Sequence, residues 1–291
     1  MNRLEKPMEM TEQYNKEKDF LVCINLEGSI FNTLEIQWKE CLIPALIKCF
    51  ELQPIAKYVR EEAEQMSLYS KNRGLNRFML LCLIFEALEK RPELNRYYFN
   101  LPDTANLKAW IMTEDFPTLT SLEEAFDKTS DTVIERALLW SHEADRSIQE
   151  LIYGTMPFPH VNKSLKKIKI FADIVVVSSN AVYDLKSEWK KSGLDEEAYF
   201  FYAQNDDDKT RYIKQLKKLG YDEENILLIG DTLGDAKVAS TSNIIFYPVI
   251  PGKESKAWKL LTDKYLDGFV NKTYRKTWEQ NQVQELKKIL T

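Results

Sequence analysis

Histidine and cysteine are scarce in this chain of 291 residues, and their scarcity narrows the chemistry that the protein can perform. Only two histidines are present, which excludes a metal site built from several histidines and argues against a Ser/His/Asp triad. The four cysteines contain no CxxC pair, so we expect them to be reduced thiols rather than disulfides. They are Cys23, Cys41, Cys49 and Cys82.

Long apolar runs and an excess of positive charge are also missing. No stretch of about 18 apolar residues occurs, so we expect no membrane-spanning helix. The first twenty residues are charged and lack the apolar core of a signal peptide, so we expect a cytoplasmic protein. With 40 basic and 45 acidic residues the net charge is -5, which argues against nucleic acid as a partner. Hydrophobic residues make up 44% of the chain, enough for a packed core.

Five short apolar segments have the character of strands. They are residues 20–26, 174–178, 199–202, 226–229 and 244–247. Several are continuous apolar runs, which is typical of strands buried on both faces of a parallel sheet. In the second half of the chain these segments alternate with helical patterns at residues 161–170, 182–191, 209–219 and 235–240. This alternation predicts an α/β fold with a doubly wound, Rossmann-like parallel sheet.

The first predicted strand stands apart from the others. Between residues 26 and 174 the sequence shows helical patterns instead, at residues 34–50, 77–90 and 132–153. We therefore predict a core domain of residues 1–33 and 157–291, interrupted by an all-helical insertion of residues 34–156. Pro157 and Pro159 suit the return to the core, because proline stiffens a link and cannot extend a helix. Residues from 255 onward have helical spacing and are expected to pack on the core.

Polar side chains follow several of the predicted strands. In an open parallel sheet, ligands bind beyond the carboxyl ends of the strands. A lysine and a hydroxyl group there suit a phosphate, and clustered carboxylates suit Mg²⁺, a hard cation that takes oxygen ligands. The candidates are Asn25, Glu27, Ser178, Lys209, Asp231 and Asp235.

The chain resembles the haloacid dehalogenase (HAD) superfamily, most of whose members are phosphohydrolases, in three stretches: VCINLEGSIFNT, VVVSSN and DDDKTRYIKQLKKLGYDEENILLIGDTLGD. The segment PFPHVNKSLKKIKIFADIVVVSSN also looks like the family's passage from hinge to second strand. The motifs have the family's order and compatible spacing, and GDTLGD is the most specific of them. The resemblance covers residues 19–33 and 155–250, and the helical insertion is similar to the family's cap domain, although longer.

The resemblance implies a role for each first-motif residue. The family's pattern is Asp-x-Asp-x-Thr, in which the first Asp attacks phosphorus and the second acts as general acid and base. Here Asn25 occupies the nucleophile position, Glu27 the acid/base position and Ser29 the place of Thr. A carboxamide has no charge and is a weak nucleophile, so Asn25 predicts impaired catalysis. Glu27 keeps a carboxylate but displaces it by about an ångström, and such misplacement can cost about 10²-fold in rate.

The remaining motifs match the family better. The resemblance implies that Ser178 hydrogen-bonds the phosphoryl group and that Lys209 offsets its charge. It also implies a weakened Mg²⁺ site. Its ligands would be Asp231 directly, Asp235 through water, Asn25 and the backbone carbonyl of Glu27.

Three functions remain open on this evidence. The protein binds a phosphorylated small molecule without hydrolysing it, or it is an active Mg²⁺-dependent phosphohydrolase in which Glu27 activates water. The third is a non-enzymatic interaction protein that uses its helical insertion. Deamidation of Asn25 would restore an aspartate, but the following Leu26 hinders the backbone attack that deamidation requires.

Each motif residue also has a structural interpretation. Asp235 and Ser178 suit helix caps, and Lys209 suits a solvated helix start beside an acidic loop. Gly28 suits the tight turn that follows the first strand.

Overall fold

The computed structural model describes residues 15–97, 100–115, 117–152, 154–178, 189–194, 200–203, 209–274 and 276–291. Its internal contacts divide the chain into two compact units. The first, here called the α/β unit, comprises Met1–Asn32 and Gly154–Ile289. The second, here called the helical unit, comprises Thr33–Tyr153 and Leu290–Thr291.

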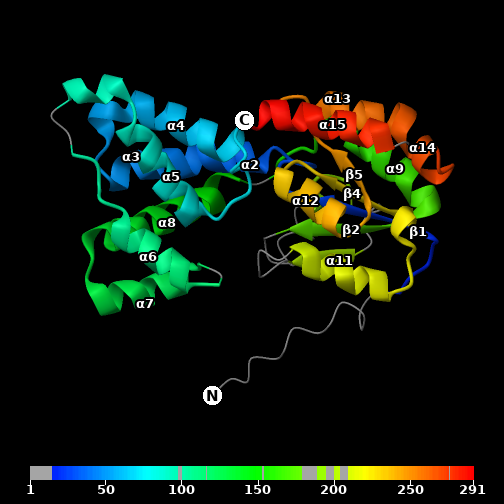
Figure 1. Cartoon of the computed structure of the whole chain (residues 1–291), viewed down its shortest axis with the longest axis horizontal. Helices are drawn as coiled ribbons and strands as arrows, with labels where there is room; N and C mark the ends of the chain where they lie inside the picture. Colours follow the sequence, from blue (N-terminus) through cyan, green and yellow to red (C-terminus); the bar gives the residue numbers. More distant parts are fainter. Residues whose placement is uncertain are drawn as a thin grey trace, which may run out of the picture. The chain divides into compact units, whose positions relative to one another are not determined.

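A five-stranded parallel sheet forms the centre of the α/β unit, with the strand order β3-β2-β1-β4-β5 (Figure 1). The strands are β1 (Phe20–Asn25), β2 (Ala172–Ser178), β3 (Phe200–Ala203), β4 (Ile226–Gly230) and β5 (Ile245–Pro248). Each lies within two residues of a predicted strand. The predicted doubly wound parallel α/β sheet is therefore confirmed.

Burial on both faces explains why the strands are continuous apolar runs. In β1 the four residues from Leu21 to Ile24 are all completely buried. Since successive side chains point to opposite faces, Val22 and Ile24 pack on one face, against Val161 and Leu165 of the neighbouring helix. The intervening residues fill the other face.

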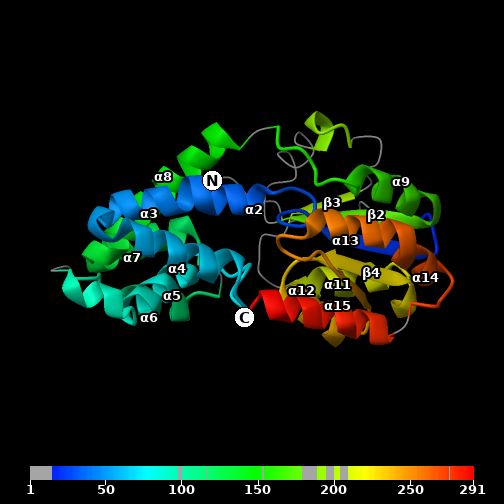
Figure 2. The same ribbon diagram turned by 90° about the horizontal axis from the view of Figure 1, so that it is seen from above.

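Helices cover both faces of this sheet (Figures 1 and 2). They are α9 (Val161–Phe171), α11 (Lys209–Lys218), α12 (Leu233–Thr241), α13 (Glu254–Leu260), a π-helical turn (Leu261–Tyr265), α14 (Leu266–Val270) and α15 (Lys276–Ile289). Helix α9 packs on β2 beside α13, and α12 packs on β4 and β5. The predicted helices at 161–170, 209–219 and 235–240 are confirmed, and the tail packs on β5 as expected. Most of the fourth, residues 182–188, lies outside the described residues.

The described part of the helical unit contains helices and no strand. Its helices are α2 (Thr33–Ile36), a π-helical stretch (Gln37–Leu42), α3 (Ile43–Cys49), α4 (Ala56–Leu68), α5 (Arg77–Glu89), α6 (Ala105–Thr113), α7 (Leu119–Thr129) and α8 (Thr132–Leu151), with short 3-10 turns at Gln53–Ile55 and Pro92–Arg96. The predicted helix at 34–50 is therefore one run with a π-helical middle. Pro44 accounts for the irregularity, because its ring would clash with the carbonyl of Glu40 in a regular α-helix.

The helical unit has its own apolar core. Trp140 on α8 is completely buried, and its Nε1 donates to the carbonyl of Leu42 at 2.9 Å. Phe50 and Phe85 pack with ring centroids 5.1 Å apart. Across the ranges that the structure describes, no helix has both the length and the apolar character needed to cross a bilayer.

Asp131 caps α8, the longest described helix, and its removal should destabilise the protein. Its Oδ1 accepts from the backbone N–H of Val133 at 2.9 Å and of Ile134 at 3.0 Å. Partial burial alone would raise the pKa of Asp131, but these bonds and one from Asn106 hold it below its usual value. The ionised carboxylate therefore stabilises the fold above the unfolded pKa, and this contribution is lost as the pH falls.

We expect Asp131→Ala to lower the free energy of unfolding by about 1 kcal/mol at pH 7. The difference from wild type should shrink on acidification, as measured by urea denaturation at several pH values. Asp127→Ala, at an exposed position on α7, is the control and should have almost no effect. Equal losses for the two variants would contradict the capping role.

Candidate functional site

The carboxyl edge of the sheet brings the first-motif and fourth-strand residues together. Asn25 is the last residue of β1, and Asp231 directly follows β4, which pairs with β1. Ser178 is the last residue of β2, one position beyond the Asn25–Val177 pair, and Lys209 is the first residue of α11. The side chains of Ser178 and Lys209 lie outside the described part of the structure, so their backbone positions alone are known.

A tight turn after β1 returns the chain toward β4. Leu26 still donates its N–H to Val177 of β2 at 2.9 Å, and Ile30 then donates to the carbonyl of Leu26 at 2.9 Å. Gly28 has a φ of 73° and donates to Phe31 at 3.1 Å. This left-handed conformation favours glycine, in agreement with the turn expected at Gly28. The turn places Ser29 beside Asp231.

Asn25 and Ser29 both hydrogen-bond the buried carboxylate of Asp231. Nδ2 of Asn25 donates to Oδ1 of Asp231 at 3.0 Å, and Oγ of Ser29 donates to the same oxygen at 3.1 Å. Asp231 has no exposed surface. Because a buried charge is costly unless it is hydrogen-bonded, these donors allow Asp231 to stay inside the protein.

The orientation of the Asn25 amide follows from its neighbours. Nδ2 also lies 3.3 Å from the backbone carbonyl of Glu27. Both neighbouring atoms accept hydrogen bonds, so the nitrogen must face them, and the reverse orientation would oppose oxygen to oxygen. The amide nitrogen, not the amide oxygen, is therefore turned toward Asp231.

Asp235 acts at the start of α12. Its Oδ2 accepts from the Thr232 hydroxyl at 2.7 Å and from the Thr232 backbone N–H at 3.1 Å. In return Thr232 accepts from the backbone N–H of Asp235 at 3.0 Å. This reciprocal pair is a capping box, which satisfies donors that the helix leaves unpaired. Asp235 therefore caps α12 in the structure, as its structural interpretation predicted.

The four expected ligands, as arranged here, do not fit Mg²⁺. Mg²⁺ requires several oxygen ligands in near-octahedral geometry. Asn25 turns its nitrogen to Asp231, the carbonyl of Glu27 accepts from that nitrogen, and Asp235 is engaged with Thr232. No group of three or more His, Cys, Asp or Glu side chains in the described ranges is arranged to hold a metal ion. The carboxamide of Asn25, which turns a nitrogen instead of an anionic oxygen toward Asp231, is the physical reason.

Cysteine offers no alternative nucleophile near this edge. Cys23 lies two residues before Asn25 but is completely buried in β1. Burial raises the pKa of its thiol well above the usual range, so the thiolate needed for attack is not formed.

Two features of the site were missed at the sequence level. The Ser29 hydroxyl, treated there only as a substitute for threonine, is a direct partner of Asp231. In addition, Trp258 donates its Nε1 hydrogen to the carbonyl of Ser29 at 2.7 Å. The two residues are 229 positions apart, and no local sequence pattern signals a contact at such separation.

Comparison with known proteins gives matches in structure alone. No family model matches the chain, and no curated protein matches its sequence. Among the solved structures it resembles is a protein provisionally named a phosphoglycolate phosphatase from Lactobacillus delbrueckii subsp. bulgaricus. That pair has a TM-score of 0.46 and 16% identity, covering 79% of this chain and 85% of the other.

Two further structures carry the name of the superfamily. A HAD family hydrolase from Deinococcus radiodurans R1, solved with bound phosphate and sodium, has a TM-score of 0.42 and 10% identity, over 80% of this chain and 81% of that one. A haloacid dehalogenase-like hydrolase from Streptococcus pneumoniae has a TM-score of 0.39 and 13% identity, over 82% and 90%. The solved structures that this chain resembles thus include hydrolases of the superfamily that its sequence motifs resemble.

Proposed function

We propose that this protein is a member of the HAD superfamily that binds a phosphorylated small molecule without hydrolysing it. One observation carries the proposal: the amide nitrogen of Asn25 donates to Asp231 at 3.0 Å. The position from which the family's nucleophile attacks therefore holds a neutral group that is already hydrogen-bonded within the protein. In this proposal the helical insertion is the cap domain of the family.

The chemistry of the amide argues against phosphoryl transfer. Covalent catalysis needs a nucleophile that can be activated, and a carboxamide has no proton whose loss at neutral pH gives an anion. An attack by the amide oxygen would also require the amide to leave Asp231 and the carbonyl of Glu27. We therefore expect no phosphoenzyme.

The same substitution favours binding of an anion. A phosphate dianion at this edge would meet one carboxylate fewer than in an enzyme with the Asp-x-Asp motif, which lowers the electrostatic repulsion. Ser178 ends β2 and Lys209 begins α11, and a hydroxyl and a lysine are residue types that bind phosphate. Their backbone positions support the proposal.

We expect Lys209→Ala to weaken binding of a phosphorylated ligand by about tenfold to about a hundredfold, because a hydrogen bond to a charged group contributes about 1.5–3 kcal/mol. The measurement is the melting temperature in rising concentrations of phenyl phosphate, with phenol as the unphosphorylated comparison. A ligand at one hundred times its Kd stabilises the folded state by about 2.7 kcal/mol. Lys218→Ala, exposed at the far end of α11, is the matched control and should bind like wild type.

The same preparation separates the alternatives. Release of inorganic phosphate from phenyl phosphate by the wild-type protein, lost in Glu27→Gln, would contradict the proposal and favour hydrolysis through Glu27. If the protein hydrolyses no phosphorylated compound and is stabilised by none, the result would favour a non-enzymatic interaction protein.

A further inference from the structure

We propose that Trp258, on a C-terminal helix far in sequence from the first motif, is a positioning residue for the Asn25–Asp231 site. This inference deepens the proposed function and rests on it for its meaning in ligand binding. The structural part of the inference, a connection from Trp258 through Ser29 to Asp231, can be tested without any ligand.

The connection consists of two consecutive hydrogen bonds in the interior of the α/β unit. Trp258 is completely buried, and its Nε1 donates to the carbonyl oxygen of Ser29 at 2.7 Å. The hydroxyl of the same serine donates to Oδ1 of Asp231 at 3.1 Å. Ser29 therefore accepts a hydrogen bond from α13 through its carbonyl and donates one to Asp231 through its hydroxyl.

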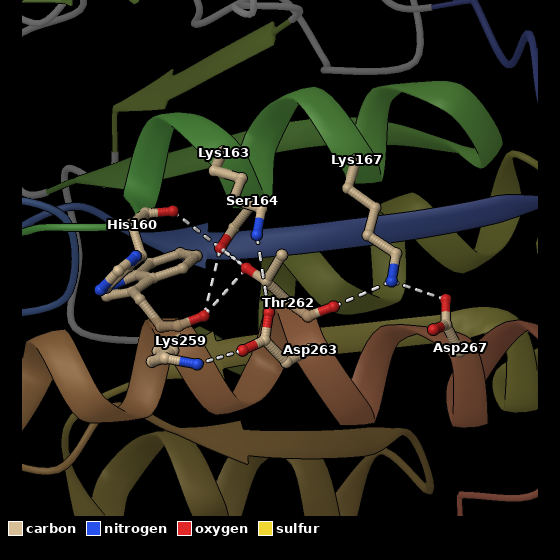
Figure 3. Close-up of polar contacts among 9 residues, drawn as sticks. His160, Lys163, Ser164, Lys167, Lys259, Thr262, Asp263 and Asp267 are labelled. Carbon is tan, nitrogen blue, oxygen red and sulfur yellow. Dashed lines mark hydrogen bonds and ion pairs between the residues drawn. The ribbon is translucent and has the colours of Figure 1, made fainter.

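Buried hydroxyl groups hold the backbone of Trp258 in place. Its carbonyl oxygen accepts from the Thr262 hydroxyl at 3.0 Å. The Ser164 hydroxyl of α9 also lies 3.3 Å from this carbonyl, but its one proton is shared with the nearer carbonyl of His160 at 3.0 Å. Figure 3 shows these two hydroxyls meeting between α9 and the C-terminal helices. The preceding residue, Ala257, accepts from the hydroxyl of Tyr247 on β5 at 2.6 Å. The backbone of Trp258 itself is thus held at α9, whereas the Tyr247 bond ends on the neighbouring residue.

Ion pairs also join α9 to the C-terminal helices, but they contribute less to the stability of this contact (Figure 3). Lys167 lies 2.7 Å from Asp267, and Lys163 lies 3.6 Å from Asp263. The Asp267 and Lys163 side chains are 62% and 69% exposed, and solvent screening leaves such pairs with little net energy. The buried hydroxyls and the indole therefore determine where Trp258 sits.

The bond to Ser29 limits where the serine side chain can point. A hydrogen bond to the carbonyl of Ser29 limits rotation of the backbone at this residue and keeps its side chain within reach of Asp231. Loss of the indole donor leaves a buried carbonyl unpaired, which is unfavourable enough for the turn to rearrange. The Ser29 hydroxyl would then leave Asp231, and the carboxylate would rely more strongly on the amide of Asn25.

The test compares Trp258→Phe with Tyr247→Phe. Each variant removes one buried donor to a backbone carbonyl near α13, but the bond of Tyr247 goes to Ala257 and not to the site. The readout is the side-chain amide resonance of Asn25 in a ¹H–¹⁵N spectrum, assigned by its disappearance in Asn25→Ala. We expect Trp258→Phe to shift this resonance and Tyr247→Phe to leave it in place.

A second readout connects the contact to binding. We expect the affinity for inorganic phosphate to fall about tenfold in Trp258→Phe, as for other residues that orient a binding group from behind, and to be unchanged in Tyr247→Phe. If Trp258→Phe does not fold, replacement of Trp258 by benzothienylalanine keeps the ring shape and removes only the N–H.

The outcomes separate the two proposals. An unmoved Asn25 resonance in the Trp258 variants overturns the positioning role, whatever the phosphate affinity. A shifted resonance in a protein that binds no phosphate supports the connection and overturns the proposed function. A resonance that shifts equally in Tyr247→Phe also overturns the specific role of Trp258, because the effect would then be general to α13.

Discussion

Asn25→Asp should lower the free energy of unfolding by about 3 kcal/mol at neutral pH in the absence of divalent cations. The substitution places a carboxylate oxygen where the amide nitrogen now lies, 3.0 Å from Oδ1 of the buried Asp231. It replaces a favourable hydrogen bond with repulsion between like charges. Two buried carboxylates at this distance repel each other strongly, because little water screens their charges. Guanidinium denaturation at neutral pH in EDTA measures the difference in the free energy of unfolding between Asn25→Asp and wild type.

Mg²⁺ should stabilise the variant and leave the wild type unchanged. The second carboxylate supplies the anionic oxygen that a hard cation needs, whereas Asn25 presents a nitrogen. The melting temperature of Asn25→Asp should thus rise with MgCl₂, since a ligand of the folded state shifts unfolding. NaCl of equal ionic strength controls for screening.

Asn25→Ala is the matched variant, because it removes the donor without adding a charge. It should lose about 1–2 kcal/mol and show no response to Mg²⁺. An equal rise in melting temperature for wild type and Asn25→Asp would contradict the conclusion that the orientation of the Asn25 amide prevents Mg²⁺ binding.

Gly230→Ala should destabilise the protein by about 3 kcal/mol. Gly230 ends β4, and a Cβ atom built there would lie 2.6 Å from Oδ2 and 2.8 Å from Cβ of Asp235. Asp235 is buried and is held in its capping box with Thr232, so it cannot move aside without loss of the cap. Thermal unfolding followed by circular dichroism measures the loss.

Gly234→Ala provides the control within the same turn and helix. A Cβ at Gly234 would lie 3.4 Å from the Thr232 hydroxyl oxygen, which is an ordinary contact. Alanine also favours the helix, so this variant should be as stable as wild type or slightly more stable. Similar losses for both substitutions would mean that the turn tolerates no side chain at all and that the contact with Asp235 is not the cause.

The central sheet was predictable because its strands are buried on both faces. The apolar run around β1 and the run at β4 can be satisfied only in the interior, and the helical patterns between the later strands require parallel crossovers. The order of strands along the chain therefore determined the sheet and the edge at which its carboxyl ends meet. The sequence also placed Asn25 and Asp231 at that edge, from the resemblance of their motifs.

The orientation of the Asn25 amide could not be predicted from the sequence, because it depends on contacts between distant residues. Amino-acid type alone allows the amide of Asn25 to turn either its oxygen or its nitrogen to Asp231. The carboxylate of Asp231, 206 positions away, selects the amide nitrogen because it accepts a hydrogen bond, and the carbonyl of Glu27 is a second acceptor on the same side. This choice turned an expected metal ligand into a hydrogen-bond donor.

The sequence alone thus determined the parallel sheet and the carboxamide at the end of its first strand. The tertiary structure decided how that residue is used. It placed the donors of Asn25 and Ser29 at the same oxygen of Asp231, and the indole of Trp258 at the carbonyl of Ser29. Apolar periodicity is a local property of the chain and is visible in the sequence. Hydrogen bonding in the interior depends on which distant groups the fold encloses together, so local sequence patterns do not predict it.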